Sequence, residues 1–311
     1  MSLLILGGSG FLGSAAARTL SSRNHQVKVI CRREPPATLF GTAPIELHLA
    51  DLATLAAADR VFDGVDTVLH FISTTTPASS MDDMAFDVSS NLFPLLNLIK
   101  IMASRRIPRL IFSSSGGTVY GIPSKLPVSE MHPADPISSY GITKLAMEKF
   151  IGLHAHNCQL QGIILRIGNP YGPYQMTGTA IGSIAHFTAS HARQQPIQIW
   201  GDGTVIRDYI FIDDLCRALV QIVEDSDFPG GVYNLASGRG YSLLDIIVEL
   251  EKVSGRKAIR SLLGARKMDV PAIVLDIAKL QNALPSWEPG VPIARGIQMM
   301  WEEAAKLSGP R

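Results

Sequence analysis

The segment Tyr140-Gly-Ile-Thr-Lys144 places a phenol and an ammonium group four residues apart. On a helix, residues i and i+4 lie on one face, so the Lys144 side chain is predicted to lie beside Tyr140. A free tyrosine has a pKa of about 10 and is a poor base at neutral pH. Because a neighbouring cation favours the phenolate, Lys144 is predicted to lower the pKa of Tyr140 toward the range of general acid/base catalysis.

A glycine-rich motif, Gly7-Gly-Ser-Gly10-Phe-Leu-Gly13, follows a short apolar run and opens a helical pattern. The glycines allow a tight turn and a close backbone approach, and the helix N-terminus offers donors to a pyrophosphate. A strand followed by this turn and a helix is the setting that a dinucleotide-binding fingerprint requires. We therefore expect NAD(P) to bind here, with contacts from Gly7, Gly10, Phe11, Leu12 and Gly13.

The second apolar run ends in Ile30-Cys31-Arg32-Arg33, with no acidic residue before Glu34. An acidic side chain at this place accepts from the ribose 2′-hydroxyl of NAD, whereas an arginine suits the 2′-phosphate of NADP. Arg32 and Arg33 thus favour NADP(H). The alternative is that both are solvent-facing residues of a loop and take no part in cofactor binding. Asp51 and Leu52, after the third run, are predicted to hold the adenine, although Asp51 also suits the N-cap of a following helix.

Short apolar runs alternate with helical patterns through the first half of the chain. Strands are predicted at 3–6, 26–30, 45–49, 67–71, 109–113 and 162–167, and helices at 11–22, 55–62, 84–104 and 139–157. Continuously apolar strands separated by helices indicate an α/β fold, a Rossmann-type doubly wound parallel sheet.

After Asn169 the alternation of apolar runs and helical patterns ends, because prolines and glycines interrupt it. A helix at 213–224 and a strand at 232–235 are predicted to return to the sheet. We expect an NAD(P)-binding domain over residues 1–168, joined by 205–237, and a smaller C-terminal substrate-binding lobe formed by 169–204 and 238–311.

Composition excludes several classes of function. The chain has 311 residues, a formal net charge of +1 and no basic run, which gives no support for nucleic-acid binding. The three scattered cysteines predict neither a disulfide framework nor a metal site, and they fit a reducing compartment. No apolar run approaches the roughly 20 residues of a membrane span, and the short apolar N-terminus lacks the basic region of a signal peptide. We expect a cytoplasmic protein that binds no membrane.

Further motifs occur in a familiar order: Ser114-Ser-Gly-Gly-Thr-Val-Tyr-Gly121, Leu165-Arg-Ile-Gly-Asn-Pro-Tyr-Gly172, Gly201-Asp-Gly-Thr-Val-Ile-Arg-Asp-Tyr-Ile210 and Arg266-Lys-Met-Asp269. With the glycine loop, Tyr140 and Lys144, they resemble the extended short-chain dehydrogenase/reductases that act on nucleotide sugars, of the UDP-glucose 4-epimerase type. The resemblance runs nearly from end to end. It implies that Tyr140 is the catalytic base, that Lys144 also holds the nicotinamide ribose, and that Ser115 binds the C4 oxygen.

The loop after Ser115 carries an extra residue relative to the family. Ser114 and Thr118 therefore remain alternatives to Ser115 as the catalytic hydroxyl, and Thr118 is otherwise expected to contact the substrate. The hydroxyls that are not catalytic would only satisfy the backbone of the loop.

The resemblance also implies the other ligand contacts. Arg207 and Arg266 would bind the diphosphate, because a planar guanidinium matches phosphate oxygens. Asn91 and Asn169 would contact the substrate, and Phe71 and Ile72 would approach the nicotinamide. The segment 71–77 departs from the pattern of the galactose epimerase, which leaves the hexose open. A homodimer is implied, with the helices at 84–104 and 139–157 of each copy forming a four-helix interface.

Several activities share this machinery. Dehydratases of the same branch carry an Asp-Glu pair just before the Val-Tyr-Gly segment, where this chain has Gly117 and Thr118, so dehydration is disfavoured. A 4-epimerase with tightly held NAD is favoured over an NADPH-dependent 4-keto reductase, which Arg32 and Arg33 would support. A non-catalytic NAD(P)-binding sensor is the third alternative, and such a protein would need neither Tyr140 nor Lys144.

Overall fold

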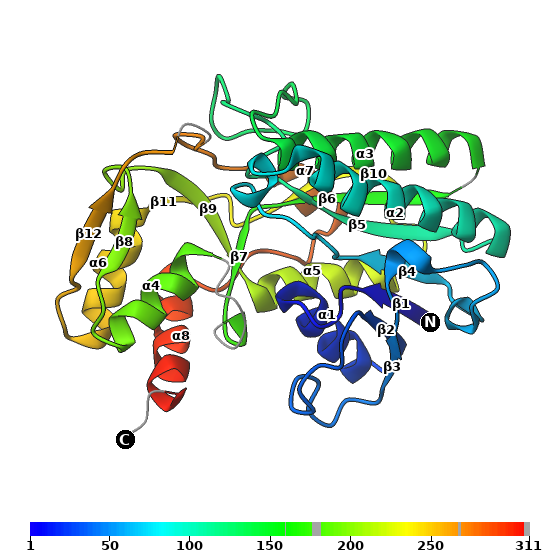
Figure 1. The fold of residues 1–311 in the computed structure, drawn as a ribbon, viewed down its shortest axis with the longest axis horizontal. Helices are drawn as coiled ribbons and strands as arrows, with labels where there is room; N and C mark the ends of the chain where they lie inside the picture. Colours follow the sequence, from blue (N-terminus) through cyan, green and yellow to red (C-terminus); the bar gives the residue numbers. More distant parts are fainter. Residues whose placement is uncertain (159, 176–181, 267–268, 308–311) are drawn as a thin grey trace.

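A computed structural model describes residues 1–158, 160–175, 182–266 and 269–307. Its centre is a seven-stranded sheet with the order β10-β6-β5-β4-β1-β2-β3, in which all neighbours run parallel (Figure 1). The strands are β1 (Ser2–Leu6), β2 (Gln26–Cys31), β3 (Ile45–Leu49), β4 (Thr67–His70), β5 (Arg109–Ser115), β6 (Gln161–Ile167) and β10 (Gly231–Leu235). The predicted doubly wound α/β class is confirmed.

Helices cover both faces of this sheet, as Figure 1 shows. Leu3 and Ile5 of β1 belong to one core, with α1 (Phe11–Ser22) and α5 (Ile212–Glu224). The alternate residues Leu4 and Leu6 belong to a second core, with α2 (Met84–Arg105) and α3 (Ser139–Cys158). Because successive side chains of a strand point to opposite faces, a strand buried on both sides is apolar on both, as residues Leu3 to Leu6 of β1 are.

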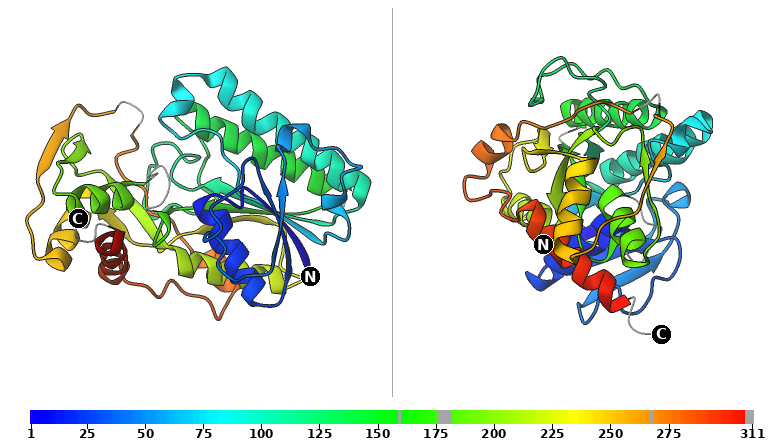
Figure 2. Two further views of the ribbon diagram at one scale, coloured as in Figure 1. Left: turned by 60° about the horizontal axis from the view of Figure 1, so that its bottom comes forward. Right: turned by 90° about the vertical axis from the view of Figure 1, so that its left-hand side faces the viewer.

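A smaller lobe lies at one end of the sheet (Figure 2). It contains two small sheets, with the orders β11-β9-β7 and β12-β8. Its elements are β7 (Asn169–Tyr171), α4 (Ser183–Ala192), β8 (Ile197–Trp200), β9 (Ile206–Phe211), β11 (Gly240–Ser242), α6 (Leu243–Ser254), β12 (Arg260–Leu263) and α8 (Ile293–Leu307). A short helix, α7 (Ala278–Ala283), contacts β10.

The predicted strands and most of the predicted helices are confirmed to within about two residues, but the helix predicted at 55–62 is wrong. Two short 3-10 helices, Leu52–Thr54 and Arg60–Phe62, flank a non-helical stretch instead, and a third lies at Ser79–Met81. The cause is tertiary. Asn97 of α2 donates to the carbonyl of Leu55, and Arg105 donates to the carbonyls of Ala57 and Asp59. Carbonyls that bind side chains of α2 are not available for helical hydrogen bonds.

The long helices α2 and α3 lie against the sheet and against each other. Among the helices of the described residues, none combines the length and the apolar character that a membrane span needs.

Candidate active site

The glycine loop between β1 and α1 is folded so tightly that side chains are excluded from it. Gly7 has a φ of +84°, and its carbonyl accepts from the Gly10 N–H at 3.0 Å. A Cβ added to Gly13 would lie 2.2 Å from the Gly7 carbonyl oxygen. A backbone without side chains, at the N-terminus of a helix, is the form of cradle that a pyrophosphate requires.

A cleft of about 610 Å³ opens beside this loop, at the carboxyl ends of β1, β2 and β4. Because β1 pairs with both β2 and β4, the cleft lies where the strand order reverses, which is the usual ligand site of a doubly wound sheet. The predicted cofactor contacts that line it are Gly7, Gly10, Arg32, Arg33, Asp51, Leu52, Phe71 and Ile72. Of the other predicted contacts, Phe11 and Leu12 pack against the core, and Gly13 is buried at the start of α1.

The side of the cleft expected to hold the adenosine is positively charged. Arg32 and Arg33 are exposed on its wall, and neither forms an ion pair with any residue that the structure describes. Among the described lining residues, Asp51 is the only acidic one. Its carboxylate accepts from the Ala53 N–H at 2.9 Å, so Asp51 caps the 3-10 helix Leu52–Thr54 while it lines the cleft.

Tyr140 and Lys144 lie beside each other in the first turns of α3. The Lys144 Nζ is buried, lies 5.7 Å from the centre of the Tyr140 ring, and donates to the Ser113 carbonyl at 3.0 Å. Ser73, which lines the cleft, lies close enough to the Tyr140 hydroxyl to influence its pKa. The phenol and the ammonium group therefore lie together behind Ser73, at the edge of the cleft.

The pKa of Tyr140 differs from the sequence prediction. Burial raises it to about 12, Ser73 opposes this rise, and the charge of Asp87 adds to it. Burial also lowers the pKa of Lys144 to about 8, against the effects of Asp87 and Glu148. The predicted lowering for Tyr140 is wrong for the protein alone, because removing the phenolate from water outweighs the effect of the neighbouring cation. At neutral pH the phenol holds its proton.

The three consecutive serines at the end of β5 have different surroundings. The Ser113 hydroxyl donates to the His70 carbonyl at 3.1 Å, and the Ser114 hydroxyl donates to the buried Glu148 carboxylate. Ser115 is half-buried, and its hydroxyl has no partner among the described residues. Thr118 lies in the following turn, with a buried hydroxyl oxygen that is also without a partner in that part of the chain. Ser115 thus keeps a hydroxyl that a ligand can use, the Thr118 hydroxyl has no partner within the described residues but is buried, and the Ser114 hydroxyl is taken up by Glu148.

Two of the predicted substrate contacts lie close to the catalytic residues. Asn169, the first residue of β7, lies beside Gly117 in the turn that follows Ser115. Asn91 lines the cleft, but it also binds the loop after β4: its Oδ1 accepts from the Thr74 N–H at 2.9 Å. The polar run from Ser73 onward, which the sequence marks as a departure from the family, is therefore part of the site.

The two arginines predicted to bind the diphosphate are brought to one corner of the smaller lobe. An Arg207 Nη2 lies 3.8 Å from the Asp269 carboxylate, and the Asp269 N–H donates to the Arg266 carbonyl at 3.1 Å. The Arg266 guanidinium lies 4.0 Å from the centre of the Trp200 ring. Trp200 is partly exposed, so it is a ring on the lobe surface rather than the core residue that its type favours.

Sequence reasoning missed two side chains at this site. The His70 ring lines the cleft at the end of β4, and neither ring nitrogen has a partner among the described residues. Burial and the charge of Lys144 lower the pKa of His70 to about 3, so the ring is neutral. Asp87 of α2 is buried next to the first turn of α3. The position of His70, a polar residue at the end of an apolar strand, could have indicated a role in the site. The sequence around Asp87 contains no comparable indication.

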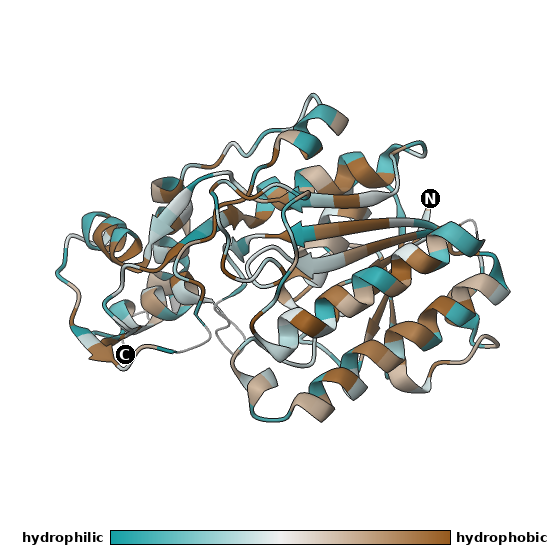
Figure 3. Ribbon diagram, turned by 90° about the horizontal axis from the view of Figure 1, so that it is seen from above, coloured by the Kyte–Doolittle hydropathy of each residue, from teal (hydrophilic) through white to brown (hydrophobic). Residues whose placement is uncertain are grey.

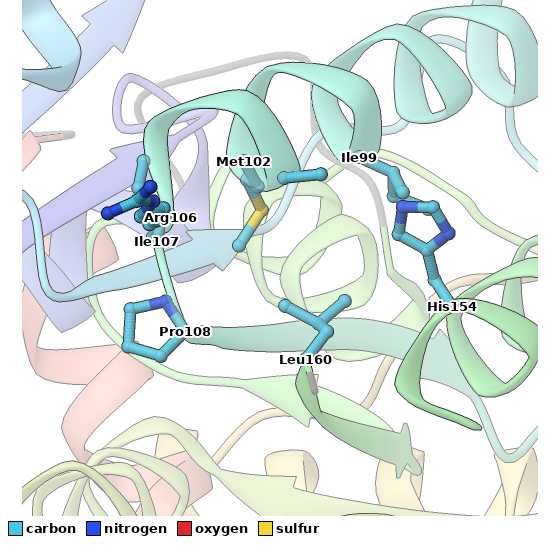
Figure 4. Close-up of a pocket in the computed structure, with 8 residues that line it drawn as sticks. Ile99, Met102, Arg106, Ile107, Pro108, His154 and Leu160 are labelled. Atoms are coloured by element: carbon cyan, nitrogen blue, oxygen red, sulfur yellow. The ribbon is translucent and has the colours of Figure 1, made fainter. Parts of the chain in front are cut away.

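A second cavity, of about 340 Å³, lies away from these residues (Figure 4). It is lined by the last turns of α2 and α3 and by the segments that lead into β5 and β6, among them Met102, Pro108, His154 and Leu160. These are the amino ends of the strands, opposite to the edge that carries Tyr140. In the described residues no group of three or more His, Cys, Asp or Glu side chains is placed to hold a metal ion.

Comparison with known proteins agrees with this geometry. Residues 3–236 match the model of the NAD dependent epimerase/dehydratase family. The chain is 27% identical, over 95% of its length and 96% of the relative's, to a protein of Methanocaldococcus jannaschii named putative UDP-glucose 4-epimerase. It is 28% identical, over 96% of both chains, to an Escherichia coli dTDP-4-dehydro-6-deoxyglucose reductase. It superposes on the UDP-glucose 4-epimerase of Bifidobacterium longum, solved with NAD+ and UDP, with a TM-score of 0.90, 26% identity and 98% coverage of both chains.

Proposed function

The chain belongs to the NAD dependent epimerase/dehydratase family, and from this membership we propose that it catalyses oxidation and re-reduction at C4 of a nucleotide-activated hexose, as a UDP-glucose 4-epimerase does. The observation that carries the proposal is the pairing of Tyr140 with Lys144, whose ammonium group is held on the Ser113 carbonyl of β5, the strand next to β4 at the dinucleotide cleft. Gly117 and Thr118 stand where dehydratases need carboxylates, which supports redox chemistry without elimination of water.

The cleft fits a dinucleotide on structural grounds. The turn at Gly7 and Gly13 leaves no room for a Cβ, and Arg32 and Arg33 extend the positive surface from it. When bound, a nicotinamide dinucleotide supplies the capacity to accept and return hydride. We propose that the glycine loop holds the pyrophosphate, that Asp51 and Leu52 hold the adenine, and that Phe71 and Ile72 face the nicotinamide.

Side chains of the protein donate and accept the proton of the C4 hydroxyl. The Tyr140 phenol, protonated at neutral pH, is set to donate to a C4 ketone, and its phenolate takes the proton in the opposite direction. Ser115 donates to the same oxygen with a hydroxyl that has no other partner in the described chain. The Lys144 ammonium, anchored on the Ser113 carbonyl, stabilises the phenolate when it forms.

The nucleotide part of the substrate is assigned to the smaller lobe. We propose that Arg207 and Arg266 bind the diphosphate, in line with the UDP bound to the Bifidobacterium longum enzyme. Asn169 and Thr118 lie where they can contact the sugar near Ser115. Residues 1–168 with α5 and β10 of the predicted segment 205–237 would then form the cofactor domain, and 169–204 with 238–311 the substrate lobe, which β9 of that segment joins.

An NADPH-dependent 4-keto reductase is the second candidate. Arg32 and Arg33 favour a 2′-phosphate, and the similarity to the Escherichia coli dTDP-4-dehydro-6-deoxyglucose reductase supports this activity. A non-catalytic sensor is the third, and the retention of Tyr140, Lys144 and Ser115 speaks against it.

The dinucleotide that the purified protein retains distinguishes these activities. The protein is denatured, and any released dinucleotide is identified by mass spectrometry. Retained NAD, together with conversion of UDP-glucose to UDP-galactose without added reductant, supports the epimerase. An empty protein that binds NADPH and not NADH supports the reductase. Tyr140→Phe should abolish either conversion, and unchanged turnover in this variant would contradict a catalytic role for Tyr140.

We also propose that the protein is a homodimer. Large apolar side chains are exposed on α2 and α3, and Figure 3 shows apolar residues spread along both helices. Phe93 is 59% exposed, Ile142 is 55% exposed and Leu153 is 55% exposed. Large exposed apolar side chains on two neighbouring helices favour a protein interface there. A monomeric mass by light scattering at micromolar concentration would count against the dimer. The buried free thiols of Cys31 and Cys216 agree with the proposed reducing, cytoplasmic compartment.

A further inference from the structure

Asp87 is a buried carboxylate without a cation in contact. Its side chain lies in the first turn of α2, the residue is 1% exposed, and within the described chain no Lys, Arg or His is within ion-pair distance. A buried charge is costly unless other groups stabilise it. In this protein hydroxyl and amide donors do so.

The donors come from three segments of the chain. The hydroxyls of Ser139 and Thr143 on α3 donate to the Asp87 Oδ2 at 2.7 and 2.8 Å. The Thr75 hydroxyl of the loop after β4 and the Asn91 amide of α2 donate to the Oδ1, the amide at 3.3 Å. One carboxylate therefore joins this loop, α2 and the first turn of α3.

Both connected segments carry the catalytic groups. Ser139 and Thr143 immediately precede Tyr140 and Lys144 in the chain, so their hydrogen bonds fix the turn on which the two catalytic side chains stand. Thr75 lies two residues after Ser73, which influences the pKa of Tyr140, and the Ser73 hydroxyl donates to the Thr75 carbonyl at 3.0 Å. The Asp87 carboxylate thus positions both the turn of α3 that carries Tyr140 and the loop that carries Ser73.

We propose that Asp87 is a positioning residue of the active site, whose buried carboxylate fixes Tyr140 against Ser73 and whose negative charge controls the release of the Tyr140 proton. The proposal rests on the function proposed above for Tyr140. It concerns the proton equilibrium of that residue, which can be measured without a substrate.

The charged groups around the site agree with this role. Tyr140 is close to Asp87 of α2 and to Lys144 of its own helix, and the charge of Asp87 contributes to its raised pKa. Asp87 and Glu148, one turn further along α3, raise the pKa of Lys144, and the Lys144 charge in turn helps to keep His70 of β4 neutral. Removal of the Asp87 charge should therefore lower the pKa of Tyr140, since less negative charge then opposes formation of the phenolate.

The test compares Asp87→Asn with Asp83→Asn. Asparagine keeps the shape of Asp87 and can accept and donate hydrogen bonds among the same hydroxyls, but it carries no charge. Asp83 is the exposed N-cap of the same helix, accepting from the Phe86 N–H at 2.8 Å, and asparagine caps equally well. The titration of Tyr140 is followed by tyrosinate absorbance, as the difference between each protein and its Tyr140→Phe counterpart. We expect a downward shift of about one pH unit in Asp87→Asn and none in Asp83→Asn.

An unchanged Tyr140 midpoint in folded Asp87→Asn would overturn the proposal, even if the wild-type protein converts UDP-glucose. Absence of turnover in the wild type would overturn only the epimerase assignment, because the titration needs no substrate. If circular dichroism shows that Asp87→Asn is unfolded, Ser139→Ala serves instead. It keeps the carboxylate and removes a hydroxyl dipole that screens it, so the midpoint should rise, and a fall or no change would again overturn the proposal.

Discussion

Glu148 and Arg166 form a buried ion pair directly behind the serines at the end of β5, with the Arg166 Nη2 at 2.7 Å from the Glu148 Oε2. The side chains are 3% and 6% exposed. The Ser114 hydroxyl donates to the same carboxylate, and the Arg166 guanidinium lies 4.7 Å from the centre of the Tyr120 ring. The pair therefore joins α3, β5 and β6 beneath the active site.

Removal of one partner of this pair should destabilise the protein strongly. In Glu148→Gln the Arg166 charge stays buried without its counter-ion, for which we expect a loss of about 3 kcal/mol in the free energy of unfolding. Urea denaturation measures the loss. Arg23→Gln, which breaks the exposed pair with Glu224, is the matched control and should leave the midpoint nearly unchanged.

Lys144 should reduce stability at neutral pH. Its pKa is lowered from 10.5 to about 8 in the folded protein, so between these values the unfolded chain binds more protons, and stability rises with pH in this window. Lys144→Met should therefore abolish turnover yet stabilise the protein near neutral pH by about 1 kcal/mol, less than the shift alone implies because the Ser113 carbonyl loses its donor. The gain should shrink as the pH approaches 10. Thermal unfolding at several pH values measures it, and a constant difference across the series would contradict the buried cation.

Gly13→Ala should prevent dinucleotide binding. The added Cβ would lie 2.2 Å from the carbonyl oxygen and 2.8 Å from the carbonyl carbon of Gly7, so the loop would have to open. Gly152→Ala on α3 is the control, since nothing lies within 4 Å of its added Cβ. Quenching of tryptophan fluorescence by added dinucleotide reports binding. Equal affinity in the two variants would mean that the glycine loop does not hold the ligand.

Ser115→Ala should reduce kcat by about 100-fold, since a donor to the reacting oxygen is lost. Ser113→Ala is the matched control from the same strand, because its hydroxyl binds the His70 carbonyl and is not available to a ligand. We expect it to change stability more than kcat. A larger loss of kcat in Thr118→Val than in Ser115→Ala would transfer the catalytic role to Thr118.

Local patterns predicted most of the fold. Short apolar runs such as Leu3 to Leu6, and the glycines that follow, report properties that a chain segment carries by itself. The stretch 55–62 failed because the residues that decide its structure, Asn97 and Arg105, are some forty positions away on α2. The local pattern of residues 55–62 contains no information about side chains that bind its backbone carbonyls from elsewhere in the chain.

The candidate site, too, was predictable where its residues belong to one short motif, and not where they come from distant segments. Tyr140, Lys144 and the glycine loop belong to short motifs, and their spacing carries the chemistry. The pKa of Tyr140 depends on burial and on Asp87, more than fifty residues earlier, which the i to i+4 spacing does not contain. Asp87 itself reads as an ordinary polar position near the start of a helix until three segments of the chain are brought together around it.

The helix α3 extends from the catalytic edge of the sheet to the cavity at its opposite edge. Tyr140 stands in its first turn and His154 lines the cavity fourteen positions later, which corresponds to about 20 Å along the helix axis. A small molecule that fills this cavity would therefore occupy neither the dinucleotide nor the sugar position. In steady-state kinetics it would behave as a noncompetitive ligand toward both, and crystallographic fragment screening would find it at a site separate from the chemistry.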